Sequence, residues 1–174
     1  MPDAMHSPTP TRRQALRALM PLLLAGGLSA CGFRLRGAQP LPFATLHLGV
    51  DTNSEFGQAL ARKVGTSGTT VAVTDPAQAD ARLEILGNQR SREILSLSAA
   101  GKVREYQLFQ TLSFRVVDRN GEELLAPVTL HSRREYNFDD TRVIAKEREE
   151  ALLFRDMEAE LLQQMMDRLA TLSP

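Results

Sequence analysis

Cys31 is the one cysteine in a chain of 174 residues, and it follows an apolar run over residues 19–28 and the short step Ser29-Ala30. A single thiol cannot form a disulfide framework within the chain, nor supply the several sulfur ligands of a thiolate metal site. Nothing around it supports thiolate catalysis. Two interpretations remain, a covalently modified cysteine or a buried free thiol, and a free thiol is a liability in an oxidising compartment.

The residues before Cys31 have the layout of a secretory signal. Three arginines between positions 12 and 17 give a positive front, residues 19–28 give an apolar centre, and small residues follow. A membrane-spanning helix needs about 20 apolar residues, so this shorter run is not predicted to cross a membrane. Residues 1–30 are therefore predicted to be a signal peptide. The pair Arg12-Arg13 leaves both general and twin-arginine export open.

The stretch Leu28-Ser29-Ala30-Cys31 resembles the bacterial lipobox. The resemblance implies that Cys31 carries a diacylglyceryl thioether, becomes the new N-terminus after cleavage and is then N-acylated. Several acyl chains make a durable anchor, because one chain alone binds marginally and each buried CH₂ adds about 0.8 kcal/mol. Gly32, in place of an aspartate, resembles the outer-membrane sorting pattern of Gram-negative lipoproteins. This covalent lipid on Cys31 is the only attached group that we expect, with no further cofactor.

Length and charge limit what the mature chain can be. Residues 31–174 suit one compact domain, and we divide them into a lipidated tether over residues 31–43 and a single domain over residues 44–174. The full chain has 21 basic and 21 acidic residues, and the signal removes three arginines and one aspartate, which leaves a net charge of about −2. This charge gives no basic footprint for nucleic acid, so no nucleic-acid partner is predicted.

The first part of the domain predicts a parallel crossover. Leu46 and Leu48 alternate with polar neighbours, as in a short strand. Candidate N-caps at residues 52–54 precede apolar residues at helical spacing, and residues 71–73 begin a second strand. Strand, helix and strand in this order are typical of a right-handed parallel unit.

Longer antiparallel strands are predicted next. Residues 82–97 form the first, with a bulge near Gly87 because the apolar alternation changes phase there. A turn around residues 99–101 leads to the clearest alternation in the chain, whose inward-facing members are Tyr106, Leu108, Leu112, Phe114 and Val116. The sheet is therefore predicted to be mostly antiparallel beyond the crossover.

The following hairpin turns at Asn120-Gly121, a pair typical of two-residue loops. Such a loop would set the outward face of one strand against the inward face of the next, so we favour a three-residue loop over residues 119–121 with glycine in the left-handed position. Pro127 cannot donate to a strand ladder, which predicts an edge strand or a bulge. The favoured register pairs Val116 with Leu124, Phe114 with Ala126, Leu112 with Val128 and Arg104 with Tyr136.

A long amphipathic helix is predicted to end the domain. Its N-terminus is expected to be capped by Asp139, Asp140 and Thr141, and its outer face to carry charge, including Lys146 with Glu150. Core packing is the expected use of its apolar stripe, and a partner surface is the alternative. The stripe consists of Phe154, Met157, Leu161, Met165, Leu169 and Leu172. The fold class is therefore α+β, with two helices on one face of a four- or five-stranded mixed, mostly antiparallel sheet.

Recognisable patterns for catalysis or metal binding are absent from the sequence. His47 and His131 lie on separate predicted strands without neighbouring ligands. No nucleophile elbow, phosphate loop or metal-binding helix motif occurs. We therefore predict no catalytic residue, no metal site and no enzymatic activity.

Four motifs follow one another along the chain. They are the lipobox, Gly32-Phe33-Arg34-Leu35-Arg36, Glu105-Tyr106-Gln107 at the start of a long strand, and Ala145-Lys146 before an acidic run and a terminal helix. Their order resembles the LptE family of lipopolysaccharide-assembly lipoproteins. The resemblance covers essentially the whole mature chain, and it implies an outer-membrane lipoprotein on the periplasmic side and in a barrel lumen. In that family the domain plugs the β-barrel LptD, assists its assembly and binds lipopolysaccharide.

The resemblance also implies a binding site for lipopolysaccharide. Lys146 matches a family lysine implicated in binding, whereas Ala99 stands where the family has an arginine two places before the turn glycine. Arg92, Lys102 and Arg104 lie near the same turn and are candidates to supply the charge, and a solvated hairpin end is the alternative. The favoured register brings this turn and the start of the last helix to one end of the sheet.

Two other functions stay open. One is a structural lipoprotein that scaffolds an envelope complex without binding glycolipid, and the other is a periplasmic hydrolase with an unfamiliar site. A large β-barrel that co-purifies with the protein favours the family function, other envelope proteins alone favour a scaffold, and turnover of a substrate panel favours a hydrolase.

Overall fold

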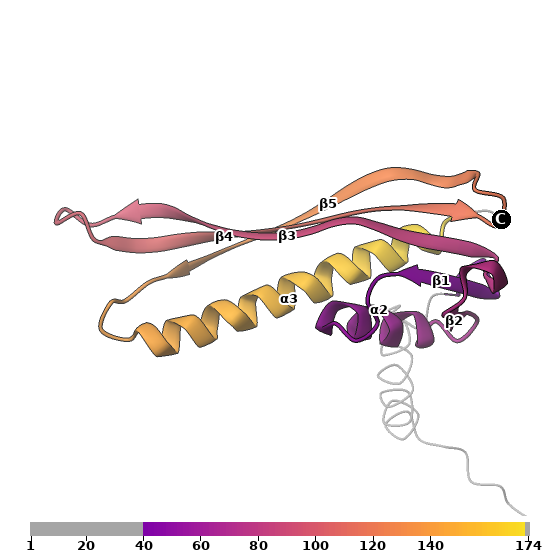
Figure 1. Ribbon diagram of the computed structural model, residues 1–174. Helices are drawn as coiled ribbons and strands as arrows, with labels where there is room; N and C mark the ends of the chain where they lie inside the picture. Colours follow the sequence, from indigo (N-terminus) through magenta and orange to yellow (C-terminus); the bar gives the residue numbers. More distant parts are fainter. Residues whose placement is uncertain (1–39, 173–174) are drawn as a thin grey trace, which may run out of the picture. The chain divides into compact units, whose positions relative to one another are not determined.

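The structure, a computed structural model, describes residues 40–172. In this range a five-stranded sheet has the order β2 (Val71–Val73), β1 (Thr45–Gly49), β3 (Ala81–Leu97), β4 (Val103–Asp118) and β5 (Glu123–Asn137). Two α-helices pack on one of its faces (Figure 1). The predicted α+β class, with a mixed and mostly antiparallel sheet, is confirmed. The predicted signal peptide, residues 1–30, and the predicted lipidation site, Cys31, lie outside the described residues.

The parallel crossover predicted from the sequence is present. Strands β1 (Thr45–Gly49) and β2 (Val71–Val73) pair in parallel and are joined by α2 (Glu55–Gly65). Helix α2 begins after Ser54, whose Oγ accepts a hydrogen bond from the Gly57 amide at 3.0 Å. This bond satisfies an amide that has no partner within the helix, which is why a serine fixes the start of α2.

Three long strands make up the rest of the sheet: β3 (Ala81–Leu97), β4 (Val103–Asp118) and β5 (Glu123–Asn137). A short 3₁₀ helix, η1 (Pro76–Gln78), precedes β3. The predicted bulge is confirmed, because the pairing of β3 with β4 shifts between Ile85 and Gly87. The inward face of β4 also holds Gln110, which is 1% exposed and donates from Nε2 to Asn88 Oδ1 at 3.2 Å. An alternation of apolar residue types gives no sign of this buried polar member.

The hairpin between β4 and β5 has the predicted three-residue loop. The Asp118 amide donates to the Glu122 carbonyl at 2.8 Å, and Gly121 has a φ of 91°, a region that favours glycine. Strand β5 is an edge strand, as Pro127 suggested.

The predicted pairs along this hairpin are wrong, because two register shifts lie between Val117 and Phe114. The unpaired residues on β5 include Pro127, which has no N–H for the ladder, so the strand bulges there. Each predicted partner on β5 is displaced by one or two positions. The observed pairs are Val116 with Leu125, Phe114 with Val128, Leu112 with Leu130 and Tyr106 with Tyr136.

The last helix, α3 (Val143–Leu169), begins after the predicted cap. Its N-cap residue is Arg142, whose side chain makes no capping hydrogen bond, so the predicted capping by residues 139–141 is wrong. Asp139 Oδ1 instead accepts hydrogen bonds from the amide and the hydroxyl of Thr141, at 2.9 and 2.7 Å. Short polar side chains often stabilise such local turns in competition with a helix. The predicted stripe packs in the core, where its fully buried members are Met157, Leu161, Met165 and Leu169.

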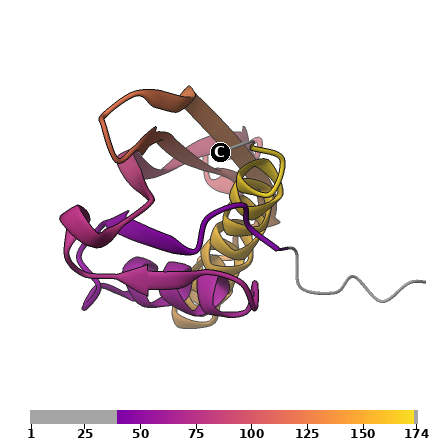
Figure 2. The ribbon, with the colours of Figure 1, turned by 90° about the vertical axis from the view of Figure 1, so that its right-hand side faces the viewer.

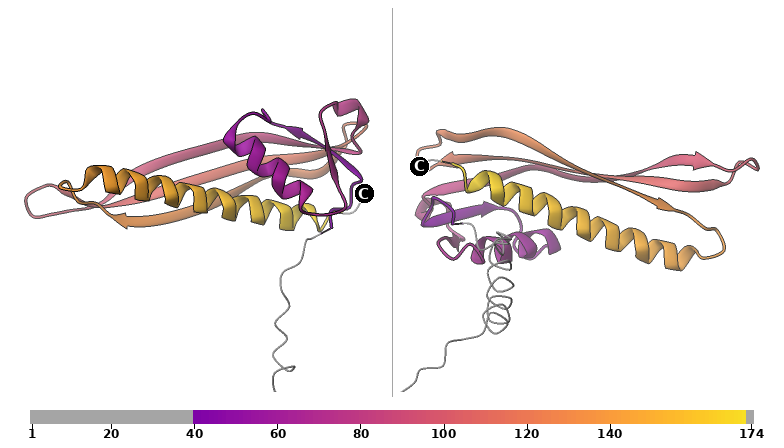
Figure 3. Two further views of the ribbon diagram at one scale, coloured as in Figure 1. Left: turned by 90° about the horizontal axis from the view of Figure 1, so that it is seen from below. Right: turned by 180° about the vertical axis from the view of Figure 1, so that it is seen from behind.

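Two apolar clusters hold the helices to the sheet. The larger one joins α2, α3 and the inner strands, and it includes Leu41 and Phe43 from the predicted tether. Helix α2 contacts α3 near this cluster (Figure 2). The smaller cluster is built on Leu108, Tyr136 and Met157, from β4, β5 and α3. Figure 3 shows α3 continuing toward the β3–β4 turn beyond the start of α2. Within residues 40–172, the part of the sheet nearest that turn is therefore covered by α3 alone.

Gly57 occupies the tightest packing position in α2. A Cβ atom at this residue would lie 2.2 Å from the Asp51 carbonyl oxygen, whereas one at Gly65 would meet nothing within 4 Å. Because a backbone oxygen cannot move aside as a flexible side chain can, Gly57→Ala is expected to lower the free energy of unfolding by about 1–3 kcal/mol. Gly65→Ala, the matched control in the same helix, should be neutral or slightly stabilising. Chemical denaturation measures both, and equal losses would contradict this packing.

Candidate functional site

A groove lies at the end of the sheet where β3 turns into β4 and β5 leads into α3, at the left of Figure 1. We call this end of the folded unit the distal end. The groove is lined by Ser98 and by residues 102–105 and 137–140. The β3–β4 turn and the loop before α3 are therefore neighbours, as the sequence predicted.

The β3–β4 turn fixes the backbone of Lys102. Ser98 donates its amide to the Lys102 carbonyl at 2.7 Å and accepts the Lys102 amide at Oγ, at 3.1 Å. Gly101 has a φ of 73°, which explains a glycine in this turn. The Lys102 Nζ atom lies 2.5 Å from Asp140 Oδ2, and the hydrogen bond to this carboxylate raises the pKa of the lysine. Both side chains are exposed, so the pair contributes little to stability.

Asp139 stabilises the loop before α3 through hydrogen bonds within that loop. Its carboxylate accepts the hydrogen bonds of Thr141, and these bonds, together with the nearby charges of Arg142 and Lys146, lower the pKa of Asp139. The Thr141 side chain is the largest cause of that shift. Asp139 is therefore ionised and held in the turn, whereas the neighbouring Asp140 reaches across to Lys102.

Lys146 lies near the start of α3, and its side chain is 18% exposed. Its Nζ atom lies 2.8 Å from Glu149 Oε2. The predicted placement of Lys146 with Glu150 on the outer face is wrong, because Glu150 accepts hydrogen bonds from the sheet residues Arg92 and Tyr136. Lys146 does not line the groove, but its charge is close enough to Asp139 to influence the pKa of that carboxyl.

Arg104 lines the groove and is exposed. Its carbonyl accepts the Phe138 amide at 2.7 Å, so it lies opposite Phe138, and the predicted position opposite Tyr136 is wrong by the two-residue displacement of the hairpin. Within residues 40–172 its guanidinium has no hydrogen-bond or ion-pair partner. Arg104 is therefore a cation that a ligand can reach without breaking an existing contact.

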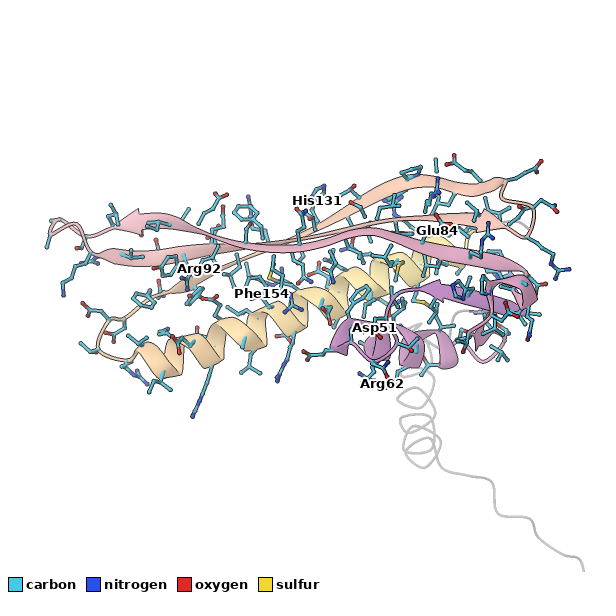
Figure 4. The ribbon with its side chains drawn as sticks, viewed as in Figure 1. Asp51, Arg62, Glu84, Arg92, His131 and Phe154 are labelled. Carbon is cyan, nitrogen blue, oxygen red and sulfur yellow. The ribbon has the colours of Figure 1, made fainter. Side chains whose placement is uncertain are left out.

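Arg92 has a different environment from the other predicted cations. Its guanidinium lies 4.4 Å from the centre of the Tyr106 ring, and its Nη1 donates to Glu150 Oε2 at 2.8 Å. Tyr136 donates its hydroxyl to the same Glu150 oxygen at 2.5 Å. Figure 4 shows Arg92 between the sheet and α3. Arg92 therefore ties β3 to α3 and does not line the groove.

Large apolar side chains are exposed at the same end as these cations. They come from the end of β3 and from the first turn of α3, on either side of the loop that holds Asp139 and Asp140. Contact with another apolar surface removes such a side chain from water and lowers the free energy. The distal end therefore combines cations with apolar groups: Ile94, Leu95, Leu97, Val143 and Ile144.

The hydroxyl of Tyr136 gives a pH-dependent test of the contact between sheet and helix. Burial, followed by the hydrogen bond to Glu150, raises the pKa of Tyr136 to about 12, above the ordinary value of 10. Between these values the unfolded chain loses a proton that the folded chain keeps, so this stabilisation is complete below pH 10 and is lost as the pH rises through 12. In a Tyr106→Phe variant Tyr136 is the single tyrosine, and its phenolate absorbance is expected to rise near pH 12. A midpoint near pH 10 in the folded variant would contradict the contact.

The two histidines within residues 40–172 do not form a pair. His47 lies on β1 and His131 on β5, and strands β3 and β4 separate them. His47 is half-buried and His131 is exposed, as predicted for surface or half-buried strand residues. Over residues 40–172 there is no cluster of three potential metal ligands, and no helix there is long and apolar enough to span a membrane.

Sequence reasoning found part of this site and missed part of it. Lys102 and Arg104 line one groove, and Lys146 lies on the helix that begins beside it. The carboxylates of Asp140 and Glu149, which hold the two lysines, were missed. The spacing of Lys146 and Glu149 by three residues is a sequence signal for that pair. No signal in the sequence connects Lys102 with Asp140, because the fold brings them together.

Known proteins resemble this chain over the region that holds the groove. A family model for LptE, described as lipopolysaccharide-assembly, matches residues 43–169. The LPS-assembly lipoprotein LptE of Pectobacterium atrosepticum is 26% identical over 148 residues, which are 83% of this chain and 79% of that protein. The protein of the same name from Yersinia enterocolitica is 27% identical over 158 residues, 88% of this chain and 73% of that protein.

A solved structure agrees with these matches. The solution structure of an uncharacterized lipoprotein B from Nitrosomonas europaea has a TM-score of 0.67 and 30% sequence identity, and the alignment covers 80% of this chain and 90% of that one. The family match includes the whole sheet, both helices and the distal groove. The chain therefore belongs to the LptE family of lipopolysaccharide-assembly lipoproteins.

Proposed function

We propose that this protein is an outer-membrane lipoprotein, anchored by lipid on Cys31, that acts with the β-barrel LptD to assemble lipopolysaccharide at the cell surface. In this proposal it binds lipopolysaccharide and assists assembly of the barrel, and it catalyses no reaction. Family membership supports the role in lipopolysaccharide assembly. The observation that carries the binding role is the combination of cations and exposed apolar side chains at the distal end.

The distal end suits an anionic amphiphile. Lipid A carries phosphates beside acyl chains, and lysine and arginine are the natural ligands of phosphate. Lys102 and Arg104 offer their charges in the groove, and Lys146 adds a third from the start of α3. Each charge-assisted contact contributes about 1.5–3 kcal/mol when it is shielded from water, and an exposed one contributes much less. Ile144 and Leu97 offer apolar contact beside them.

The other face of the sheet suits a barrel interior. No helix within residues 40–172 covers this face, where Glu84 and His131 lie (Figure 4). Its side chains bond mainly to one another across strands, as Gln107 does to Glu135 at 2.8 Å and Arg115 to Glu84 at 2.7 Å. A barrel wide enough to hold a domain has a polar interior. A face made largely of polar side chains can lie against such a wall through polar contacts.

Charge reversal tests whether lipopolysaccharide binds at the distal end. We expect Lys102→Glu combined with Lys146→Glu to weaken binding of lipopolysaccharide by about tenfold or more, because two attractive contacts become repulsive. The matched control is Arg115→Glu with Arg119→Glu at the opposite end, since all four cations form exposed or partly exposed ion pairs. Binding is measured on folded variants at equal ionic strength. Equal losses from both pairs would show diffuse electrostatic attraction instead of a site.

A further inference from the structure

We propose that Asp140 and Glu149 are internal competitors for the anionic ligand, a regulation of the distal site that rests on the proposed function. In the free protein their carboxylates hold the ammonium groups of Lys102 and Lys146. A phosphate group of the ligand competes with these carboxylates for the N–H groups and the charge of the two lysines. The two acids therefore lower the affinity of the site and keep its lysines from binding other anions.

The geometry of the two pairs supports displacement. Lys102 Nζ lies 2.5 Å from Asp140 Oδ2, and Lys146 Nζ lies 2.8 Å from Glu149 Oε2. The carboxylate side chains are 53% and 46% exposed, so each can turn away into water without a cavity or an unpaired buried charge. Neither carboxylate has another hydrogen-bond partner within residues 40–172. Nothing except the lysine holds them in place.

The ion pairs further along α3 are built differently. Glu150 and Glu158 are 20% and 10% exposed, and each accepts an arginine from the sheet, Arg92 and Arg90. Removing one partner of such a shielded pair leaves a charge without compensation. These pairs hold the helix to the sheet. The pairs of Asp140 and Glu149 lie at the distal site, and the elements that they join are also held by other contacts.

The loop itself separates the two aspartates by role. Asp139 is held by two hydrogen bonds from Thr141 and keeps the turn in shape. The Asp140 side chain makes no hydrogen bond within its own loop and reaches Lys102 on the β3–β4 turn. Moving the Asp140 side chain therefore changes the charge of the groove without unfolding the loop. Arg104, in the same groove and without a partner, is the cation from which a phosphate can begin the exchange.

Neutralising the acids is expected to tighten binding. Asp140→Asn or Glu149→Gln should each lower the dissociation constant about two- to fivefold, and the double variant up to about tenfold, since exposed ion pairs of this kind contribute fractions of a kcal/mol to about 1 kcal/mol. The gain should be largest at low salt, because ions screen exposed charges over about 10 Å at 0.1 M. Glu122→Gln, an exposed acid in the β4–β5 turn, changes net charge equally and should leave affinity within twofold.

The experiment titrates the purified lipidated protein in detergent with fluorescent lipid A that carries two phosphates, with EDTA present. A double-mutant cycle repeats Asp140→Asn in a Lys102→Gln background. There the gain in affinity should be smaller, because the lysine for which the carboxylate and the phosphate compete is absent. Unchanged or weaker binding by the Asp140 and Glu149 variants, with normal binding by the wild type, would overturn the inference. An equal gain from Glu122→Gln would do the same. A wild type that does not bind lipid A would overturn the proposed binding function itself.

Discussion

Replacing Cys31 with serine is expected to leave the protein without its lipid anchor. A serine hydroxyl cannot form the thioether that the lipobox-like run over residues 28–31 implies, and the chain has no second thiol to take its place. We expect the predicted signal, residues 1–30, to remain attached in this variant. Because several acyl chains give a durable anchor and one gives a marginal one, the loss should be close to complete.

Mass spectrometry of the membrane-extracted protein measures this outcome directly. The wild-type N-terminal peptide should begin at Cys31 and carry the mass of a diacylglyceryl group and an N-linked acyl chain, whereas the Cys31→Ser protein should retain residues 1–30. Gly32→Asp is the companion variant, since it should keep the lipid but fractionate away from the outer membrane. An unmodified Cys31 thiol in the mature wild-type chain would rule out the anchor.

The sequence was sufficient to predict the elements of the fold. Alternation along β4 and the three- and four-residue spacing along α3 identify both buried faces, because a sheet face and a helix stripe can be recognised from a single segment. The candidate N-caps at residues 52–54 likewise indicated the start of α2, and Ser54 is the one that caps it. These features depend on neighbours in the chain, which the sequence contains.

Register was harder to predict than secondary structure. The three-residue loop at Gly121 is right, yet the pairs beyond Val117 are displaced by two register shifts, one between Val117 and Val116 and a second, at Pro127, between Val116 and Phe114. A bulge adds unpaired residues to one strand, and the alternation of apolar and polar residues does not predict how many. A displacement of β5 by two residues keeps the same side chains on the inward face, so the prediction of buried residues is still right. The predicted partner of Arg104 is wrong, because Arg104 lies opposite Phe138.

The site was predicted at the level of segments and missed at the level of partners. The β3–β4 turn and the loop before α3 follow from the hairpin connections, so their proximity was predictable. The contact of Lys102 with Asp140 joins residues that are 38 positions apart in the sequence. It depends on the conformations of two exposed side chains, which bring the ammonium and the carboxylate together. Asp140 was read as a helix cap, a role that its type suits equally well. Residue type alone does not distinguish these roles.

Depleting this protein is expected to lower the amount of correctly assembled LptD strongly. The wall of a wide barrel has no inner surface to contact when its polar lumen is empty. We propose that the polar face of the sheet supplies this surface, and that face consists of cross-strand pairs such as Ser113 with Thr129. Immunoblots for the mature barrel and for its disulfide state follow the effect. Unchanged levels and unchanged disulfide maturation in depleted cells would count against a role in barrel assembly.

Purification of the tagged protein from outer membranes, followed by identification of what remains bound, tests the partnership most directly. The tag belongs at the C-terminus, because α3 ends at Leu169, at the end of the sheet away from the distal groove (Figure 1). We expect LptD to co-purify as one large β-barrel, with lipopolysaccharide retained by the wild type and reduced in the Lys102→Glu, Lys146→Glu variant. Recovery of other envelope proteins without any large β-barrel would contradict the proposed function and favour a scaffold.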